Sequence, residues 1–261
     1  MTLQNETFAA AHPPIVPSEL VCEAPVAIVC NAVTLGVMMA SPADLEDFAL
    51  GFAWTEGVIE QASDLHEIEI VTHDTGTEAR LWLSHAAGVR AAARQRALIG
   101  PVGCGLCGID SLDKVDRALP RLSAGAVHMT LTEACAGPDL LRACQPEHDR
   151  TRGCHAAGFL VPGRGIVMAR EDVGRHNALD KLAGALMHAG LDPASGAVVL
   201  TSRVSTEMVQ KAVAMGTGTV IAVSTATDYA ARMAQRANLT LVTRVRDGHC
   251  EVLSAPDRLS I

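Results

Sequence analysis

Aromatic side chains are scarce in this chain, which has 2 Trp, 1 Tyr and 4 Phe among its 261 residues. Proteins that hold single-stranded nucleic acids stack the bases on aromatic rings, so this composition argues against such a binder. Positive charge is also limited, since 21 Lys and Arg stand against 29 Asp and Glu and leave a net charge of −8. We therefore expect no nucleic-acid partner.

Long apolar runs are missing as well, and no stretch approaches the length of a membrane span, so we expect no membrane partner. The first residues lack the basic segment and apolar segment of a secretory leader. The 8 cysteines follow no repeating framework of the kind that disulfide-rich secreted domains show. Together these absences predict a cytoplasmic protein with reduced cysteines.

The pattern of apolar residues predicts two folded parts behind a flexible tail at residues 1–18. Residues 19–100 are expected to form the smaller, α+β domain. Its predicted elements are a helix that begins at Ser41-Pro42 and ends near Gly57, and strands at residues 26–30, 34–39, 67–71 and 78–83. Residues 101–150 are expected to be a CxxC loop and helical connector, with helices at 109–122 and 130–144, the second broken near Gly137-Pro138.

From residue 151 to residue 261, short β-branched strands alternate with helices. The predicted strands cover residues 157–161, 165–169, 197–201, 219–223 and 240–245, and the predicted helices cover 176–189, 205–215 and 227–236. This alternation predicts an α/β domain whose sheet is partly parallel and covered by helices on both faces.

The most reactive residues in the sequence are Cys104 and Cys107, in the run Gly103-Cys104-Gly105-Leu106-Cys107-Gly108. A helix is predicted directly after them, and a helix N-terminus lowers the pKa of a thiol and so favours the nucleophilic thiolate. The pair could be a redox or sulfur-relay site, half of a zinc site, or two incidental thiols in a glycine loop. Zinc needs four ligands, and only Cys154-His155, far along the chain, could complete the set, so the first interpretation is favoured.

Two polar runs follow predicted strands, at residues 171–177 (EDVGRHN) and 201–205 (TSRVS). Open α/β sheets bind their ligands at the carboxyl ends of their strands. Hydroxyl groups, Arg203 and a helix N-terminus are suited to a phosphate. The same residues would also serve as helix caps and surface ion pairs, so the runs alone do not separate the two roles.

A third run, Arg244-Val245-Arg246-Asp247-Gly248-His249, follows the last long predicted strand. Its two arginines alternate onto one face, and Asp247 could accept hydrogen bonds from a base or a ribose. Asp-Gly is also the favoured dipeptide of a two-residue β-hairpin turn, and the residues by themselves favour that simpler interpretation.

Residues 171–181 (EDVGRHNALDK) closely resemble the signature of the formate dehydrogenase accessory sulfurtransferases, the FdhD family. The resemblance runs from about residue 20 to the C-terminus in the family's order. It includes residues 23–28 (EAPVAI), 41–47 (SPADLED), 56–57 (EG), the CGLCG run, 155–157 (HAA) and 202–212 (SRVSTEMVQKA).

This resemblance implies a sulfurtransferase that carries persulfide sulfur from a cysteine desulfurase to the Mo (or W) bis(molybdopterin guanine dinucleotide) cofactor. That transfer would activate the catalytic subunit of formate dehydrogenase. The resemblance assigns the persulfide to Cys104, with Cys107 as its partner, and implies no resident metal. It assigns the bound cofactor, or a GDP-like nucleotide in its place, to Arg244, Val245, Arg246, Asp247, Gly248 and His249.

The resemblance further implies a homodimer and a three-layer, cytidine-deaminase-like C-terminal domain. The chain departs from the family's pattern at Arg152, at Thr206 and at Thr243-Arg244, all on the proposed cofactor side. The alternative is a non-catalytic molybdenum cofactor chaperone whose CxxC holds a structural zinc.

Overall fold

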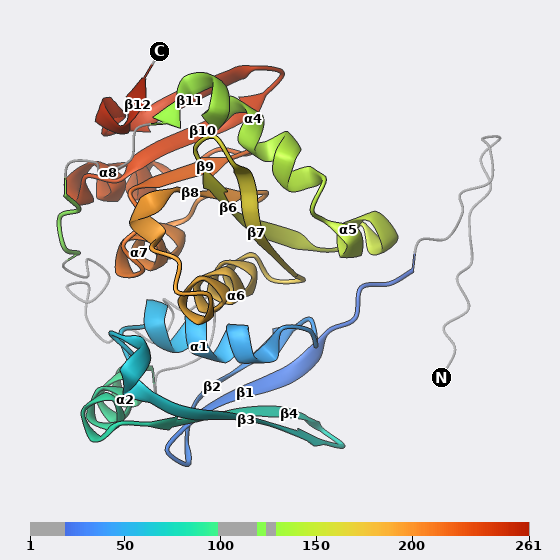
Figure 1. Cartoon of the computed structure of the whole chain (residues 1–261). Helices are drawn as coiled ribbons and strands as arrows, with labels where there is room; N and C mark the ends of the chain where they lie inside the picture. The colour runs from blue at the N-terminus through green and yellow to red at the C-terminus, as the bar shows by residue number, and fades with distance from the viewer. Residues whose placement is uncertain (1–18, 99–118, 124–128, 261) are drawn as a thin grey trace.

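The computed structural model of the chain describes residues 19–98, 119–123 and 129–260. The predicted tail at residues 1–18, most of the predicted helix at 109–122, and both cysteines of the CxxC run lie outside these ranges. The described residues fold into two stacked lobes, a small lobe of residues 24–98 and a large lobe of residues 129–260 (Figure 1). Every helix among the described residues is too short or too polar to cross a bilayer.

The small lobe contains one four-stranded sheet and two α-helices. Its elements are β1 (Ala24–Cys30), β2 (Val33–Ala40), α1 (Leu45–Thr55), the 3-10 helix η1 (Ala62–Asp64), β3 (Leu65–His73), β4 (Gly76–Leu83) and α2 (His85–Leu98). The strand order is β2-β1-β4-β3, in which β1 runs parallel to β4 and the other neighbours are antiparallel.

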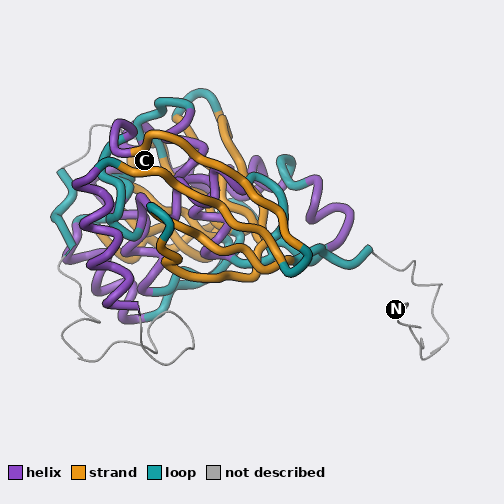
Figure 2. The backbone as a smooth tube through the Cα atoms, turned by 90° about the horizontal axis from the view of Figure 1, so that it is seen from below, coloured by secondary structure: helices purple, strands orange, loops and turns teal. Residues whose placement is uncertain are grey.

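The core of the small lobe lies between this sheet and α1. Alternate residues of β1, including Val26 and Ile28, are buried together with Phe48 and Leu50 of α1. The strands form the bottom of the molecule in Figure 1, which faces the viewer in Figure 2, and α1 covers their other side, toward the large lobe. The four predicted strands are therefore confirmed.

Two predictions about helices of the small lobe are wrong. The first helix begins at Leu45, not at Ser41-Pro42, because the Ser41 hydroxyl is used elsewhere: it accepts a hydrogen bond from the backbone N–H of Val173 (3.0 Å). The sequence-based prediction also lacks α2. Its alanine-rich sequence, HAAGVRAAARQRAL, carries no strong apolar stripe that would mark it as amphipathic.

The large lobe is built around a six-stranded sheet. Its elements are β5 (Met129–Thr130), α4 (Leu131–Arg142), α5 (Pro146–Thr151), β6 (His155–Val161), β7 (Gly165–Asp172), α6 (Arg175–His188), the 3-10 helix η2 (Pro193–Ser195), β8 (Ala197–Leu200), α7 (Thr206–Ala214), β9 (Thr219–Ala222), α8 (Asp228–Ala237), β10 (Thr240–Arg246), β11 (His249–Ser254), the 3-10 helix η3 (Pro256–Arg258) and β12 (Leu259–Ser260).

The strand order of this sheet is β11-β10-β9-β8-β6-β7. Strands β8, β9 and β10 are parallel, and the remaining neighbours are antiparallel. Central strands such as β8 (AVVL) and β9 (TVIA) are buried along their whole length, as expected for parallel strands with both faces covered.

Helices cover both faces of the sheet, as predicted. Val198 and Leu200 of β8 pack with α6, α7 and α8, whereas Ala197 and Val199 point to the opposite face and pack with α4. The strands and helices predicted from residue 157 to residue 245 are all present. Only the predicted break in the connector helix is wrong, because α4 continues through Pro138 without interruption.

The two lobes meet where α1 lies against α6, and the backbones touch there. A Cβ atom placed on Gly51 would lie 1.7 Å from the carbonyl oxygen of Asp180, and one placed on Gly184 would lie 1.9 Å from that of Asp47. Only glycine fits at such a close approach. The position of the large sheet relative to the small lobe is therefore fixed by direct helix-to-helix contact.

Candidate functional site

The carboxyl ends of the parallel strands β8, β9 and β10 form one edge of the large sheet, which we call the carboxyl edge. The segments that follow β8 and β9 are joined there by backbone hydrogen bonds, because the N–H of Val204 donates to the carbonyl of Thr225 (3.1 Å). The N–H of Arg244 donates to the carbonyl of Ser224 (3.0 Å). Arg203, which is exposed, and Arg244 therefore flank the same loop at residues 223–227.

The antiparallel strands β6 and β7 bring the signature residues to the same edge. His155, the first residue of β6, pairs with Asp172, the last residue of β7. The N–H of Ala156 donates to the Thr201 hydroxyl (2.9 Å), which ties β6 to the segment that follows β8. The predicted ligand runs at residues 171–177 and 201–205 thus lie together, as the rule for open α/β sheets requires.

Histidine and arginine side chains gather at this edge. His176 Nε2 lies 2.9 Å from Glu207 Oε2 and 3.4 Å from Ser205 Oγ. Burial lowers the pKa of His155, and the positive charge of Arg175 lowers it further, together with His148 and His176. The Nε atom of Arg175 is buried and has no hydrogen-bond partner among the described residues. An anionic ligand would supply the missing acceptor and offset this positive charge.

The run at residues 244–249 forms the end of β10, a two-residue turn and the start of β11. Asp247 (φ 52°) and Gly248 (φ 75°) both have positive φ, and Arg246 pairs with His249 across the turn. This is the Asp-Gly hairpin that the residues alone favour. Arg244 and Arg246 are both exposed, and between them Val245 is buried against the core. The two arginines therefore present a positive surface beside the carboxyl edge, and Arg244 Nη1 also lies 3.0 Å from Glu251 Oε1.

Half of the signature is used to join the lobes. Asp172 accepts hydrogen bonds from the N–H groups of Ser41 (3.0 Å) and Gly174 (2.8 Å) and from Asn177 Nδ2 (2.9 Å). Lys181 Nζ lies 2.7 Å from Asp172 Oδ2 and donates to the carbonyl of Ser41 (2.9 Å). Within the signature, Arg175 and His176 do not take part in this junction and lie at the carboxyl edge.

A second buried cluster also joins the lobes, and no local sequence pattern predicts that its members meet. Lys211 Nζ lies 2.9 Å from Asp180 Oδ1 and 2.9 Å from Glu56 Oε1. Burial would raise the pKa of Glu56, but the charges of Lys211 and Arg94 outweigh it and lower the pKa to about 2. These groups touch one another across the lobe interface, so their role is structural.

The three departures from the family's pattern lie in different surroundings. Arg152 ends α5 with φ 57°, in the left-handed region that favours glycine. Thr206 is the first residue of α7. Thr243 is completely buried in β10, and its hydroxyl has no hydrogen-bond partner among the described residues.

The structure describes the C-terminal flank of the thiol loop but neither thiol, since Cys104 and Cys107 lie outside the described residues. The N–H of Leu122 donates to the carbonyl of Ala237 (2.9 Å), and Asn238 Nδ2 donates to the carbonyl of Leu122 (3.0 Å). Leu119 and Leu122 pack against the core of the large lobe. The described residues 119–123 therefore lie against the C-terminal end of α8.

Within the described residues, no group of three or more His, Cys, Asp or Glu side chains is placed to hold a metal ion. The long-range zinc partner considered above, Cys154, is buried and lies near Thr151 and Ser41. Burial and the nearby Glu171 carboxylate raise the pKa of its thiol. A raised pKa disfavours the thiolate that zinc requires.

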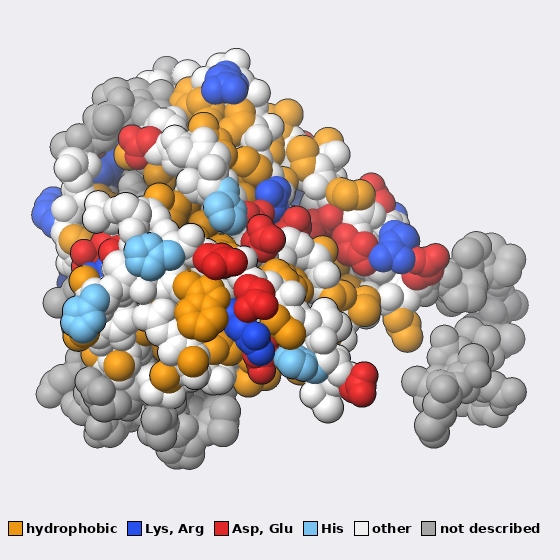
Figure 3. Space-filling model, turned by 60° about the horizontal axis from the view of Figure 1, so that its bottom comes forward, with side chains coloured by type: hydrophobic (Ala, Val, Ile, Leu, Met, Phe, Trp, Pro, Cys, Tyr) orange, Lys and Arg blue, Asp and Glu red, His pale blue; other side chains and the backbone are white. Residues whose placement is uncertain are grey.

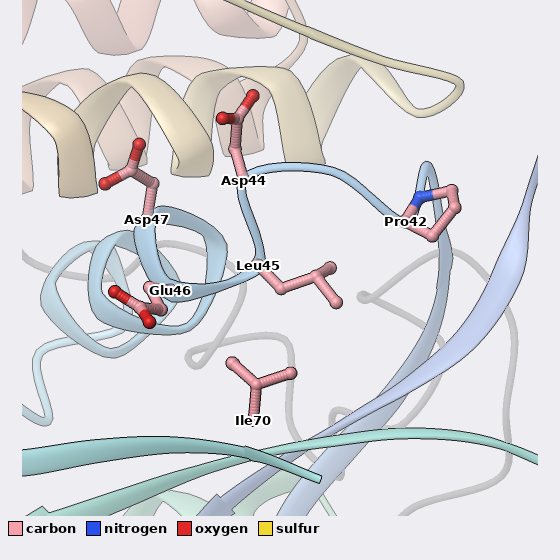
Figure 4. A pocket seen from close by; sticks show the side chains of 6 residues that line it. All are labelled: Pro42, Asp44, Leu45, Glu46, Asp47 and Ile70. Atoms are coloured by element: carbon pink, nitrogen blue, oxygen red, sulfur yellow. The ribbon is translucent and has the colours of Figure 1, made fainter. Parts of the chain in front are cut away.

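A hollow of about 390 Å³ lies apart from this edge, between the start of α1 and β3 (Figure 4). Leu45 and Ile70 point toward each other across it, while Asp44 and Asp47 point away toward the neighbouring helix. Asp47 is held there by Arg170 (2.7 Å) and His188 (2.7 Å). Figure 3 shows acidic, basic and hydrophobic side chains intermixed on the lower face. Because three of the six residues around the hollow are acidic, its surroundings do not suit an anionic ligand.

Comparisons with known proteins agree with the resemblance read from the sequence. A protein of Cupriavidus necator named "Sulfur carrier protein FdhD" is 46% identical over 244 residues, which cover 93% of this chain and 84% of that protein. A protein of Bordetella petrii with the same name is 44% identical over 239 residues, covering 92% of this chain and 86% of the relative.

The fold has a counterpart among solved structures. A crystal structure of a candidate formate dehydrogenase accessory protein from Desulfotalea psychrophila superposes with a TM-score of 0.72 at 24% identity, covering 92% of this chain and 90% of that one. The family model described as the FdhD/NarQ family matches residues 21–260. The chain belongs to the FdhD/NarQ family.

Proposed function

We propose that this protein is a sulfur carrier that acts in the maturation of formate dehydrogenase. The observation that carries the proposal is the family match over residues 21–260, which includes the CxxC run, together with relatives more than 40% identical that are named as sulfur carriers. The catalytic subunit of formate dehydrogenase would be one partner and a cysteine desulfurase the other. A homodimer in the cytoplasm is part of the same proposal.

The chemistry assigned to Cys104 is exchange of a sulfane sulfur. The Cys104 thiolate attacks the outer sulfur of the desulfurase persulfide, an S–S bond forms as another breaks, and the desulfurase leaves as its thiolate. The persulfide on Cys104 then passes its outer sulfur to the metal centre of the Mo (or W) bis(molybdopterin guanine dinucleotide), which is the substrate. Cys107 is the neighbouring thiol that assists release. The first transfer needs no oxidant or reductant, because the sulfur stays at the sulfane level. In the second transfer Cys104 leaves as its thiolate, and the two electrons that convert the sulfane atom into a sulfide ligand would come from a reduced metal centre of the substrate, which would be oxidised by two electrons.

The carboxyl edge is the part of the described structure best suited to the dinucleotide substrate. Arg203, Arg244 and Arg246 supply positive charge at its rim, and Arg175 supplies a buried donor atom that has no partner in the described part of the chain. Phosphate oxygens accept bonds from such guanidinium groups. Asp247 and His249, at the hairpin turn, provide polar contacts for a base or a ribose. The sheet with helices on both faces is consistent with the proposed cytidine-deaminase-like layering of this lobe.

The decisive experiment follows the mass of the intact protein after incubation with a cysteine desulfurase and cysteine. We expect a gain of one sulfur atom, and Cys104→Ala should abolish that gain. The matched control is Cys144→Ala, since Cys144 is an exposed thiol on the large lobe. Cys107→Ala should keep the adduct but slow its transfer.

Retention of the full adduct in Cys104→Ala would contradict the assignment of the persulfide. The alternative, a cofactor chaperone with zinc at the CxxC, would be shown by one zinc per chain together with unfolding on chelation. GDP binding does not separate the two, because both need the nucleotide site.

A further inference from the structure

Two further cysteines, Cys135 and Cys250, lie on the side of the large sheet that α4 covers. Cys135 lies on α4 and Cys250 is the second residue of β11 (Figure 1). Both pack against the same apolar cluster, which contains Ala134 of α4 and Val245 of β10. Cys135 acts on the Cys250 thiol and raises its pKa, so the two side chains are neighbours in this cluster although they stand 115 residues apart in the chain.

Their surroundings differ from those of the other described cysteines. Cys135 and Cys250 are both free and half-buried, so a small reagent reaches them while the core still holds their positions. Cys22 and Cys144 are exposed, and Cys30 and Cys154 are buried. Cys250 also directly follows the hairpin turn of the proposed substrate segment.

We propose that Cys135 and Cys250 form a reversible disulfide when oxidised glutathione, or another small disulfide, accumulates around the protein. In the first step one thiolate attacks a glutathione sulfur, so that a mixed disulfide forms and one glutathione leaves as its thiolate. In the second step the neighbouring thiol loses its proton and attacks the mixed disulfide, releasing the second glutathione. The two cysteines lose two electrons, which the glutathione disulfide gains, and reduced glutathione in excess reverses the reaction.

The resting state of this pair is the dithiol. Burial and the adjacent Cys135 raise the pKa of Cys250 to about 11, which keeps its thiol protonated at neutral pH. A protonated thiol reacts slowly, so brief oxidation should leave the pair intact. Once formed, the disulfide would tie α4 to the start of β11. The chain that forms the hairpin at residues 247–248 would then be anchored on both sides, by β10 and by α4.

The proposal is tested by mapping disulfides in the full-length protein after incubation with oxidised glutathione, alkylation of the remaining thiols and digestion with trypsin. The expected tryptic peptides separate the cysteines: residues 122–142 carry Cys135, 247–258 carry Cys250, 97–114 carry Cys104 and Cys107, and 143–150 carry Cys144. We expect the cross-link of peptides 122–142 and 247–258 to exceed any cross-link of peptide 143–150 by about tenfold or more, because neighbouring thiols have a high effective concentration.

Two variants sharpen the result. Cys250→Ser should remove the cross-link and leave Cys135 alkylated or as a glutathione adduct, whereas Cys144→Ser should leave the cross-link unchanged. If peptides 122–142 and 247–258 are recovered only as alkylated or glutathione-bearing forms while peptide 97–114 has oxidised, the proposal is overturned. Disulfide mapping of the wild-type protein tests the proposal even if a variant fails to fold. Because this outcome does not involve sulfur transfer, it stands or falls separately from the proposed function.

Discussion

Asp172 and Lys181 form an ion pair with 2.7 Å between Oδ2 and Nζ, and both side chains are completely buried between the lobes. Burial of two charges is costly, but here the remaining hydrogen-bonding capacity of Asp172 is used by Gly174 and Asn177 and by the backbone of Ser41. The signature therefore includes residues that hold the sheet edge in place as well as residues that face it.

Asp172→Asn should destabilise the protein, because it leaves the buried Lys181 ammonium without its counter-charge. Loss of one member of such a pair typically costs about 3–5 kcal/mol of the free energy of unfolding. Denaturant unfolding followed by circular dichroism measures the change. The control is Asp228→Asn, which breaks an exposed pair with Arg232 and should cost less than about 1 kcal/mol. If both substitutions lowered the free energy of unfolding equally, the buried pair would contribute no more to stability than the exposed pair.

Gly184→Ala should disturb the contact between α1 and α6. The added methyl group would lie 1.9 Å from the backbone carbonyl of Asp47, so the helices must separate. We expect a loss of about 3 kcal/mol in the free energy of unfolding, at the upper end for overpacking. Gly36→Ala is the matched control, since the nearest atom there is the sulfur of Met38 at 3.4 Å. An unchanged melting temperature for Gly184→Ala would refute the close approach.

The stability of the protein should fall in acid partly through Glu56. Its pKa is lowered from 4.5 to about 2, so the folded state binds its proton less readily than the unfolded state does. The resulting stabilisation, about 3 kcal/mol, is fully present above pH 4.5 and is lost as the pH falls toward 2. Unfolding curves from pH 7 to pH 3 should therefore be less pH-dependent in Glu56→Gln than in the parent. Identical pH profiles would contradict this assignment.

Arg246→Gln should weaken GDP binding if the hairpin meets the nucleotide. Loss of one charge-assisted hydrogen bond typically raises Kd by about tenfold to a hundredfold. Isothermal titration calorimetry with GDP measures the change, and Arg232→Gln, an exposed arginine on α8, is the control. Binding that is equally strong in both variants would remove Arg246 from the site.

Arg152→Gly should stabilise the protein. Arg152 adopts φ 57° at the end of α5, a conformation that costs a residue with a side chain about 1 kcal/mol relative to glycine. Its contact with Asp149 at 3.8 Å is exposed and offsets little of this cost. An increase in melting temperature would agree with this expectation, and a decrease would show that the Asp149 contact dominates.

Much of the large lobe could be predicted from the sequence because its strands are short, β-branched and buried, and because glycines follow the ends of α6 and α7. Gly190 (φ 63°) and Gly216 (φ 84°) do follow α6 and α7 in the left-handed conformation. The starts of helices were harder to predict. Ser41-Pro42 has the local chemistry of a helix start, yet Ser41 bonds to Val173, more than 100 residues away. Local rules cannot anticipate such a tertiary contact.

The unbroken helix α4 shows a second limit of prediction from local sequence. Pro138 removes one backbone hydrogen bond, yet α4 continues through it. The neighbouring Gly137 is buried so close to the sheet that an added Cβ would lie 3.3 Å from Val199. The candidate site also contains features that could be predicted from the sequence and features that could not. The carboxyl edge follows from the strand order, so the runs at 171–177 and 201–205 could be placed together. The buried partners Thr55, Glu56 and Lys211 could not, since nothing in their local sequence links them.

The closeness of α1 and α6 has a consequence for which parts of the protein can change shape. With Gly51 and Gly184 in contact with opposing backbone carbonyls, neither helix can slide or roll past the other without a steric collision. The two lobes therefore have no hinge at this contact. If the proposed dinucleotide substrate binds at the carboxyl edge, adjustment to it would come from the segments that follow β8, β9 and β10, while the framework behind them stays fixed.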